Sequence, residues 1–555
     1  MLEKNQLFET EITGLTSEGS GVCRVDGVAV FVPSTAVGDR IRVKIVKVLS
    51  SYAFGIVDEI LEPSGDRIVV DCPVCSKCGG CVYRHISYEA ECRAKSAVVE
   101  DAFRRIGGLS PEFEEFQGAL ETSRYRNKAQ YPLALQDGKA VCGFYAPRSH
   151  RVIPVEDCPL QPKIFSHIAA DVLGFINSRR VSVYDEKSGT GIMRHIYLRC
   201  GAHSGEIMLC LVVRRDISRE LAGFVREVTQ KYPQIVSVVL NINPEKTNVI
   251  LGKKCVTLFG SDTISDVMCG NKVDISPLSF YQVNTVQAER LYAKALEYAA
   301  PDNTKVIVDL YCGAGTIGLS MAKTAGKIIG VEIVPQAVEN AGKNAESNNI
   351  TNAEFHCGDS GEVFAKLRSR GCDPDIIVLD PPRKGCSEET LQTVFGAQPD
   401  KIVMISCNPS TAARDAKWLS NNGYSTVKVC GFELFPRTRH VETVVLLSHK
   451  KPDSVINVKV EFGEGEGKIP LDNIEKRAES YKPKERVTYK MIKEYIEAKH
   501  GFKVHTAYIA EVKRDLGLPM YDAPNAVEEL KQPRKHPTPE KVEAIKDALK
   551  HFEVI

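Results

Sequence analysis

Strand and helix patterns alternate between residues 304 and 449. Short apolar runs rich in Val and Ile predict buried strands, and the stretches between them space apolar residues three and four apart, which predicts helices. Strands that lead into helices in turn predict a parallel sheet covered on both faces, a doubly wound α/β fold. The predicted strands begin with a run at Val306 and continue at 327–332, 354–357, 376–380, 401–406, 426–433 and 444–448.

The remainder of the chain has different patterns. Short alternating strands and Gly-rich turns over residues 7–62 predict a small β-barrel with OB-like topology, a fold that commonly binds RNA. An α/β pattern follows, and near the C-terminus helical patterns occupy 488–499, 506–516 and 539–551. We therefore predict a multidomain α/β protein. Its domains are a barrel at 1–62, a central α/β region at 63–275, the doubly wound domain at 276–450, a linker at 451–487 and a helical appendage at 488–555.

Composition indicates a soluble protein of several domains. The 555 residues exceed the usual single core, and the 43% hydrophobic and 26% charged content is ordinary. The sequence contains neither an apolar run long enough to cross a membrane nor a signal peptide, and 18 cysteines without secretion fit a reducing cytoplasm. Because the formal net charge is only +1, any contact with nucleic acid must come from local basic patches.

A Gly-rich turn follows the first strand of the doubly wound domain. Gly313, Gly315 and Gly318 have the spacing of a dinucleotide-binding loop between a strand and a helix. Glu332 closes the next strand, near the spacing expected for a carboxylate that binds ribose hydroxyls. This pattern predicts a cofactor that carries adenosine and is compatible with both NAD and S-adenosylmethionine.

Three later strand ends favour S-adenosylmethionine. Asp380 ends one predicted strand, Cys407 follows another, and Glu442 precedes the last. If the last strand pairs antiparallel with residues 426–433, all three positions share the carboxyl edge of the sheet, where ligands bind in such folds. A soft nucleophile and a base beside a methyl donor suit carbon alkylation, whereas hydride transfer has no use for a thiol.

Cysteines are concentrated between residues 72 and 81. Cys72, Cys75, Cys78 and Cys81 recur every third residue and, together with neighbouring glycines, favour an iron–sulfur cluster. Zinc is the alternative, although zinc ligands usually come as two separated pairs. Cys158, next to a proline in a predicted loop, is a further candidate ligand.

Several polar positions are compatible with more than one role. The basic aromatic residues 124–128 and the later residues 148–151 suit RNA phosphates and unpaired bases, but a solvated strand face is the simpler interpretation. Gln282 could present its amide to a base or cofactor, or cap the following helix. Asp359, after the third strand, could reach an adenine amino group or lie on the surface.

Taken together, these motifs resemble the bacterial RNA uracil-5 methyltransferase family, and within it the enzymes that act on 23S rRNA. The resemblance covers about residues 7–449 and leaves the last hundred residues without a role. It implies an N-terminal TRAM-like barrel and a Rossmann-like class I methyltransferase domain. The motifs that carry it are Cys72-x5-Cys78-Gly-Gly-Cys81, Phe280-Tyr-Gln-Val-Asn284, Asp309-Leu-Tyr-Cys-Gly-x-Gly-Thr-x-Gly-Leu, Asp380-Pro-Pro-Arg, Ser406-Cys-Asn-Pro and His440-Val-Glu-Thr443.

The resemblance also implies roles for individual residues. Cys407 would be the nucleophile and Glu442 the proton acceptor. Cys75 is an extra thiol within the family's spacing, and by residue pattern alone it would be the fourth cluster ligand. The resemblance favours Cys158 instead, so that a [4Fe-4S] cluster would be held by Cys72, Cys78, Cys81 and Cys158. S-adenosylmethionine would be contacted by Gln282, Tyr311, Glu332 and Asp380, to which the loop pattern adds Gly313, Gly315 and Asp359.

The implied reaction is S-adenosylmethionine-dependent methylation of carbon 5 of a loop uridine that is flipped out of 23S rRNA. We expect a cytoplasmic monomer that binds neither DNA nor a membrane. Carbon-5 methylation of a tRNA uridine or an RNA cytosine is an alternative, although cytosine enzymes usually carry their cysteine in a Pro-Cys pair. Amino-group methylation and a non-catalytic iron–sulfur protein that binds RNA are further alternatives.

Overall fold

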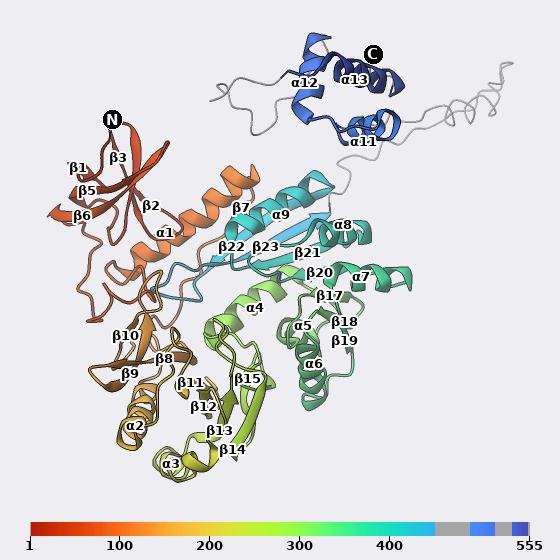
Figure 1. Ribbon diagram of the computed structural model, residues 1–555. Helices are drawn as coiled ribbons and strands as arrows, with labels where there is room; N and C mark the ends of the chain where they lie inside the picture. Colours follow the sequence, from red (N-terminus) through yellow and green to blue (C-terminus); the bar gives the residue numbers. More distant parts are fainter. Residues whose placement is uncertain (1, 450–488, 517–535, 553–555) are drawn as a thin grey trace. The chain divides into compact units, whose positions relative to one another are not determined.

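The alternating strands and helices of the doubly wound region form an eight-stranded sheet in the computed structural model, which describes residues 2–449, 489–516 and 536–552 (Figure 1). Five parallel strands are extended by an antiparallel pair and a short edge strand. In spatial order the strands are β19 (Ala353–Cys357), β18 (Lys327–Glu332), β17 (Val306–Leu310), β20 (Ile376–Leu379), β21 (Lys401–Ser406), β23 (Glu442–His449), β22 (Tyr424–Phe432) and β7 (Glu112–Phe113).

The strand order reverses at β17. The chain first adds β18 and β19 on one side of this strand and then β20 and β21 on the other. Ligands of open α/β sheets bind outside the carboxyl ends of the strands at such a reversal. The Gly-rich turn after β17 therefore lies at the expected binding edge.

Successive residues of each strand pack into two different cores, because side chains alternate between the faces of a sheet. Ile307, Ile376 and Val403 pack with helices α4 and α5, whereas Val308, Ile377 and Met404 pack with α1, α8 and α9. Figure 1 shows these two sets of helices on opposite faces. The helices are α1 (Tyr88–Asp101), α4 (Thr285–Ala299), α5 (Thr316–Met321), α6 (Pro335–Ser347), α7 (Ser360–Ser369), α8 (Glu388–Ala397) and α9 (Pro409–Asn421).

Helix α1 and strand β7 join this sheet from a distant part of the sequence. β7 pairs in parallel with β22, and Val99 and Phe103 pack in the same core as α9. A π-helical turn, η1 (Ala102–Gly107), follows α1. The segment that precedes the central region in sequence thus stabilises the strands around Glu442.

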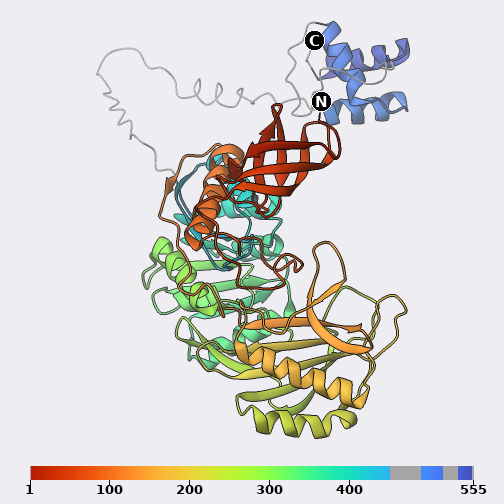
Figure 2. The same cartoon turned by 90° about the vertical axis from the view of Figure 1, so that its left-hand side faces the viewer.

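The central region is a seven-stranded sheet with two helices on one face. Figure 2 shows α2 (Lys163–Arg179) and α3 (Ser218–Lys231) side by side on this face. The apolar residues of both helices fill one core with the sheet. Its strands, in spatial order, are β10 (Val152–Pro154), β9 (Lys139–Tyr145), β8 (Lys128–Gln136), β11 (Met193–Cys200), β12 (Ile207–Val213), β13 (Ile235–Ile242) and β14 (Lys254–Gly260), and a hairpin of β15 (Ile264–Met268) and β16 (Asn271–Ile275) follows.

The N-terminal residues form a separate six-stranded sheet around its own small core. Buried Val and Ile residues alternate with exposed or half-buried ones, as in a closed or strongly curved sheet with one apolar face. In spatial order the strands are β1 (Leu7–Glu11), β5 (Arg40–Val48), β6 (Tyr52–Glu62), β4 (Val28–Val32), β3 (Gly21–Val25) and β2 (Gly14–Leu15).

The chain divides into two compact units, Met1–Val455 and Ile456–Ile555. The described part of the second unit consists of α11 (Tyr489–His500), α12 (Thr506–Asp515) and α13 (Pro539–His551), which share one apolar core. The expected linker at 451–487 lies outside the described residues. No described helix is long and apolar enough to cross a membrane.

Candidate functional site

Cys407 and Glu442 lie at the ends of adjacent strands: Cys407 directly follows β21, and Glu442 is the first residue of β23. β21 ends at Ser406, which pairs antiparallel with Thr443, so Cys407 follows one member of this pair and Glu442 precedes the other. We expected the last strand to begin at Val444, but β23 begins two residues earlier. Glu442 is consequently fixed within the sheet, where it is 6% exposed.

The charges of four groups act on one another at this strand edge. Burial, Glu442 and Asp380 raise the pKa of the Cys407 thiol to about 11, while Arg383 opposes them. Burial and the carboxylates of Asp380 and Glu433 raise the pKa of Glu442 well above its ordinary value, again opposed by Arg383. Burial also raises the pKa of Asp380 to about 7. The thiol, two carboxyl groups and one guanidinium therefore face a common site.

The loop after Cys407 is tied to the loop that carries Arg383. Asn408 caps helix α9, since its Oδ1 accepts a hydrogen bond from the Ser410 N–H at 3.1 Å. The Asn408 Nδ2 donates to the backbone oxygen of Arg383 at 3.1 Å. A proline in the first turn of α9 suits the helix start, and the positive end of the helix dipole lies close to the thiol.

The three glycines of the loop after β17 serve different purposes. Gly315 has φ +78°, and a Cβ there would lie 2.9 Å from the ring of Phe355. A Cβ on Gly318 would lie 2.9 Å from Ile328, so this glycine permits close packing of helix on sheet. A Cβ on Gly313, by contrast, would meet nothing within 4 Å, although its φ of +55° also favours glycine. Gly313 thus borders open space in which a ligand can approach the backbone.

Two carboxylates hold this loop in place. Glu332, at the end of β18, accepts hydrogen bonds from the Gly313 N–H at 3.1 Å and the Val334 N–H at 2.9 Å. Asp309 accepts one from the Gly318 N–H at 2.9 Å, and burial raises its pKa to about 8. Glu332 therefore lies beside the glycine loop.

The other expected cofactor residues have defined neighbours. The Tyr311 hydroxyl lies 3.2 Å from the Thr390 Oγ1, and the Tyr311 backbone adopts φ +68°. The side chain of Gln282 interacts with the phenol of Tyr292. The interpretation of Gln282 as a helix cap is wrong, because Asn284 caps α4 instead. Asp359 caps α7 and is exposed.

Five cysteines line one cavity between the central region and the loop before α1. Arg84 and Arg126 also line it, and the Arg84 guanidinium interacts with Cys81. Arg84 is buried and pairs with Asp71 at 2.6 Å, but its Nε and Nη2 have no hydrogen-bond partner among the described residues. The cysteines are Cys72, Cys75, Cys78, Cys81 and Cys158.

The described residues contain no group of three or more His, Cys, Asp or Glu side chains arranged to hold one metal ion. A tetrahedral zinc site needs sulfur atoms about 3.8 Å apart, given Zn–S bonds of about 2.3 Å. The separation of Cys158 from the other four cysteines in sequence nevertheless disappears in the fold, where all five share one cavity.

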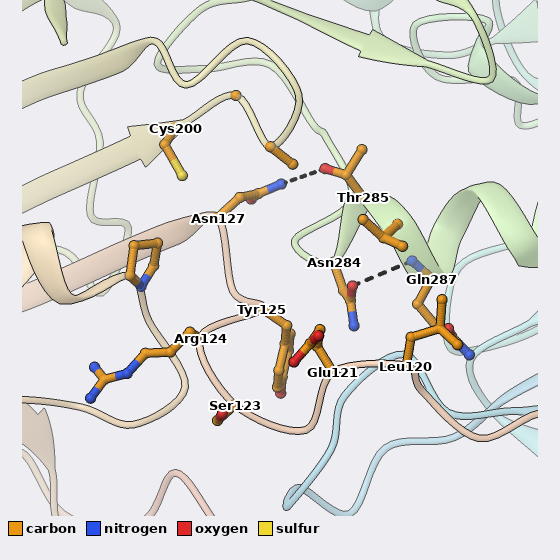
Figure 3. A pocket seen from close by; sticks show the side chains of 14 residues that line it. Leu120, Glu121, Ser123, Arg124, Tyr125, Asn127, Cys200, Asn284, Thr285 and Gln287 are labelled. Carbon is orange, nitrogen blue, oxygen red and sulfur yellow. Dashed lines mark hydrogen bonds between the residues drawn. The ribbon is translucent and has the colours of Figure 1, made fainter.

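The basic stretch 124–128 borders a second cavity, shown in Figure 3. Arg124 forms a bidentate ion pair with Asp157 at 2.6 and 2.7 Å, which neutralises its charge. The Tyr125 hydroxyl donates to the backbone oxygen of Pro436 at 3.0 Å, and Asn127 donates to Thr285 at 3.0 Å. These side chains connect the central region to α4 and to the loop before Glu442.

Sequence reasoning gave no role to some groups that surround the site. Arg383 belongs to the Asp380-Pro-Pro-Arg motif, which directly follows a strand, so the sequence could have placed this arginine at the site. Lys95 and Glu433 form a buried ion pair close to Glu442 but lie 338 residues apart, and nothing in the local sequence connects them. Glu91 and Lys95 are spaced as an ordinary surface pair on a helix.

Residues 87–450 match the tRNA (Uracil-5-)-methyltransferase family, and residues 2–57 match the TRAM domain. The chain belongs to the RNA uracil-5 methyltransferase family. An RNA methyltransferase described as uncharacterized, from Clostridium tetani, is 40% identical over 448 residues, which cover 81% of this chain and 97% of that protein. A similar relative from Bacillus cereus is 41% identical over 448 residues, which cover 80% of this chain and 97% of the relative.

A solved structure of a family member shares the fold. The Pyrococcus abyssi tRNA (uracil-54, C5)-methyltransferase, in complex with S-adenosyl-L-homocysteine, superposes with a TM-score of 0.64 at 25% identity. The alignment covers 79% of this chain and all of the archaeal one. In the present chain, the eight-stranded sheet is therefore a class I methyltransferase domain that follows a TRAM barrel, as expected from the sequence.

Proposed function

We propose that this methyltransferase transfers a methyl group from S-adenosylmethionine to carbon 5 of one uridine in 23S rRNA. The observation that supports this most is that the Cys407 thiol and the buried carboxyl of Glu442 adjoin the same Ser406–Thr443 pair, and that the charge of Glu442 acts on the thiol. Amino-group methylation requires no thiol at this position. A non-catalytic RNA-binding protein requires neither the thiol nor the buried carboxyl.

Cys407 supplies the nucleophile that makes carbon 5 reactive. Carbon 5 of uracil attacks a methyl group poorly. A thiolate that adds to carbon 6 converts the ring into an enolate whose electron pair reaches carbon 5, so one hard step becomes two easier ones. The raised pKa of the thiol means that the resting group is protonated, and Arg383 is the nearby cation that favours the thiolate.

Glu442 completes the reaction as a base. After methylation, carbon 5 still carries its hydrogen, and the sulfur can leave only once that proton has been removed. Burial and neighbouring carboxylates raise the pKa of Glu442, so its ionised form is a strong proton acceptor. As the proton moves to Glu442, the carbon–hydrogen electrons form the ring double bond and the carbon–sulfur electrons return to the Cys407 sulfur.

The methyl donor fits the loop after β17. Gly313 borders open space, Gly315 allows the left-handed turn, and Glu332 presents its carboxylate there. Bound S-adenosylmethionine would supply the methyl group beside the strand ends. The residues that we assign to the donor are Gln282, Tyr311, Gly313, Gly315, Glu332, Asp359 and Asp380.

The cysteine cavity fits an iron–sulfur cluster. We assign a [4Fe-4S] cluster to Cys72, Cys78, Cys81 and Cys158, because these thiols share one cavity. The two unpartnered nitrogens of Arg84 would donate to anionic sulfur, which accounts for a buried guanidinium there. Cys75 also lines the cavity and remains the alternative fourth ligand. The cluster's role would be structural, to fix the central region for RNA binding.

The barrel offers a surface for unpaired RNA. Phe31, Tyr52 and Phe54 form a half-buried aromatic group with ring centroids 5.5 to 5.9 Å apart. Lys47 lies opposite Phe54 on the neighbouring strand, and Lys44 lies opposite Ile56. In the described part of the chain neither lysine forms an ion pair. Aromatic faces flanked by free cations suit stacked bases and phosphates.

A tRNA uridine is the second candidate target, because the archaeal relative of known structure acts on uracil 54 of tRNA. For this chain we favour rRNA, because the barrel and the cysteine motif resemble those of the enzymes that act on 23S rRNA. The test is methylation in vitro of 23S rRNA and of tRNA from cells that lack this protein, followed by nucleoside analysis. We expect 5-methyluridine in 23S rRNA alone. Methylation of tRNA alone, or methylated cytosine, would contradict the proposal.

A further inference from the structure

Lys95 is a buried lysine that joins helix α1 to the segment before Glu442. It is 1% exposed, and its Nζ lies 2.9 Å from Glu91 and 2.5 Å from Glu433, both fully buried. The same Nζ lies 3.4 Å from the backbone oxygen of Phe435. A buried ammonium costs free energy unless carboxylates or other acceptors satisfy its hydrogen bonds. Here Glu91 of the same helix is one such acceptor, and Glu433, directly after β22, is the other.

The segment from Glu433 to Thr438 has no regular structure of its own and depends on such contacts. Glu433 uses its second oxygen to accept the Phe435 N–H at 2.9 Å. The Arg437 N–H donates to Glu91 at 2.7 Å, and the Arg437 guanidinium donates to the backbone of Ile86 at 2.9 Å. Glu91, Lys95 and Glu433 therefore clamp both ends of this segment onto α1.

Glu433, one of the three residues that clamp this segment onto α1, lies next to the strand partner of Glu442. Phe432 is the cross-strand partner of Glu442 in the hairpin of β22 and β23, and Glu433 follows Phe432 directly. The charge of Glu433 acts on Glu442, and Lys95 is the cation that balances Glu433. Glu442 is thus connected to the Lys95–Glu433 ion pair in two ways, through its strand partner Phe432 and through the charge of Glu433.

We infer that Lys95 is a positioning residue for proton removal: it fixes the Glu433–Thr438 segment so that the Glu442 carboxylate reaches the hydrogen on carbon 5 of the methylated adduct. Attack by Cys407 depends on β21 and on the turn held by Asn408, whereas the ammonium of Lys95 binds Glu91, Glu433 and the backbone of Phe435. Loss of Lys95 should therefore slow resolution of the adduct while leaving its formation largely intact. This inference rests on the proposed function.

The test measures the two steps separately in single-turnover reactions of the full-length protein with 23S rRNA. Adduct formation is followed by the slow band on a denaturing gel, and resolution by release of methylated RNA. Lys95→Met is the main variant, and Arg93→Met is its matched control, because Arg93 lies on the same helix with an exposed side chain. The double variant Lys95→Met/Glu433→Gln removes both charges of the Lys95–Glu433 ion pair, and it replaces the single variant in this test if the single variant does not fold.

We expect Lys95→Met, or the double variant, to slow resolution about ten-fold or more, to change formation less than about three-fold, and to accumulate the methylated adduct. Arg93→Met should behave as the unaltered protein. Equal slowing of both steps, or unchanged resolution in both Lys95 variants, would overturn the inference. If the unaltered protein forms no adduct, the proposed function fails instead, whatever the Lys95 variants do.

Discussion

Cys407 and Glu442 both adjoin the Ser406–Thr443 pair of β21 and β23: Cys407 follows Ser406, and Glu442 precedes Thr443. The register of two antiparallel strands thereby holds nucleophile and base next to one cross-strand pair. The two groups also oppose each other's ionisation, because each negative charge disfavours the other. Thiolate and carboxylate should therefore be needed in different steps.

Glu442→Gln should stop the reaction after methyl transfer. The amide preserves the shape of the side chain but cannot accept the carbon-5 proton, so release of product should fall by about 10²–10⁴-fold. A slow-migrating protein–RNA band should accumulate on a denaturing gel. Glu354→Gln, at a partly exposed position of β19, is the control and should turn over normally. A Glu442 variant that shows no such band would refute the assignment.

Arg383→Gln should reduce the reactivity of Cys407. Arg383 lowers the pKa of this thiol, so its removal raises the pKa further and decreases the thiolate fraction at a given pH. In the unaltered protein the rate of Cys407 alkylation should rise about ten-fold per unit from pH 7 to 9, because the pKa is about 11. Mass spectrometry of the Cys407 peptide measures both effects.

The exposed neighbour Lys384 supplies the control for Arg383. Lys384→Gln removes one positive charge from the same loop at an exposed position, where solvent screens its effect on the thiol. We expect its alkylation rate to stay close to that of the unaltered protein. Faster alkylation in Arg383→Gln than in the Lys384 control would contradict the electrostatic role of Arg383.

Cys158→Ser and Cys75→Ser should separate the two candidate ligands of the cluster. After anaerobic purification, iron and sulfide analysis should find about four irons per chain in the unaltered protein and in Cys75→Ser. Cys158→Ser should lose most of this iron, because a required thiolate is missing. The opposite pattern would make Cys75 the fourth ligand, and an iron-free unaltered protein would refute the cluster.

The aromatic group of the barrel should contribute to RNA affinity. Phe54→Ala removes a stacking surface and should weaken RNA binding by about 1–3 kcal/mol. Lys47→Ala should reduce the slope of the logarithm of the binding constant against the logarithm of the salt concentration by about 0.7. Fluorescence anisotropy with a labelled rRNA fragment at several salt concentrations measures both. Lys323→Ala, on the exposed surface of the methyltransferase domain, should leave affinity unchanged. Equal losses in all three variants would argue against a specific barrel surface.

The strands of the methyltransferase domain were predictable because their apolar runs are bounded by clear turn residues. The expected bounds of β18 and β21 agree with the structure, and helix α4 also lies where expected. The site residues could be placed at one sheet edge from the same pattern, since strand ends in a doubly wound sheet share that edge.

Contacts between distant segments could not be predicted. Strand β7 has two residues and no pattern of its own, and it forms only because β22 offers an edge to pair with. Lys95 looks like part of a solvated helix pair until the fold brings Glu433 against it. Glu442 was expected before a strand, but cross-strand pairing with Phe432 extends the strand to include it.

The covalent bond between Cys407 and the pyrimidine is the central claim, and trapping tests it most directly. RNA that carries 5-fluorouridine at the target position cannot release a proton from carbon 5, so the adduct should persist after methyl transfer. After nuclease and protease digestion, mass spectrometry should find a methylated fluorouridine attached to the peptide that contains Cys407, and only when S-adenosylmethionine was present. An adduct on another residue, or methylated RNA without any adduct, would contradict the account.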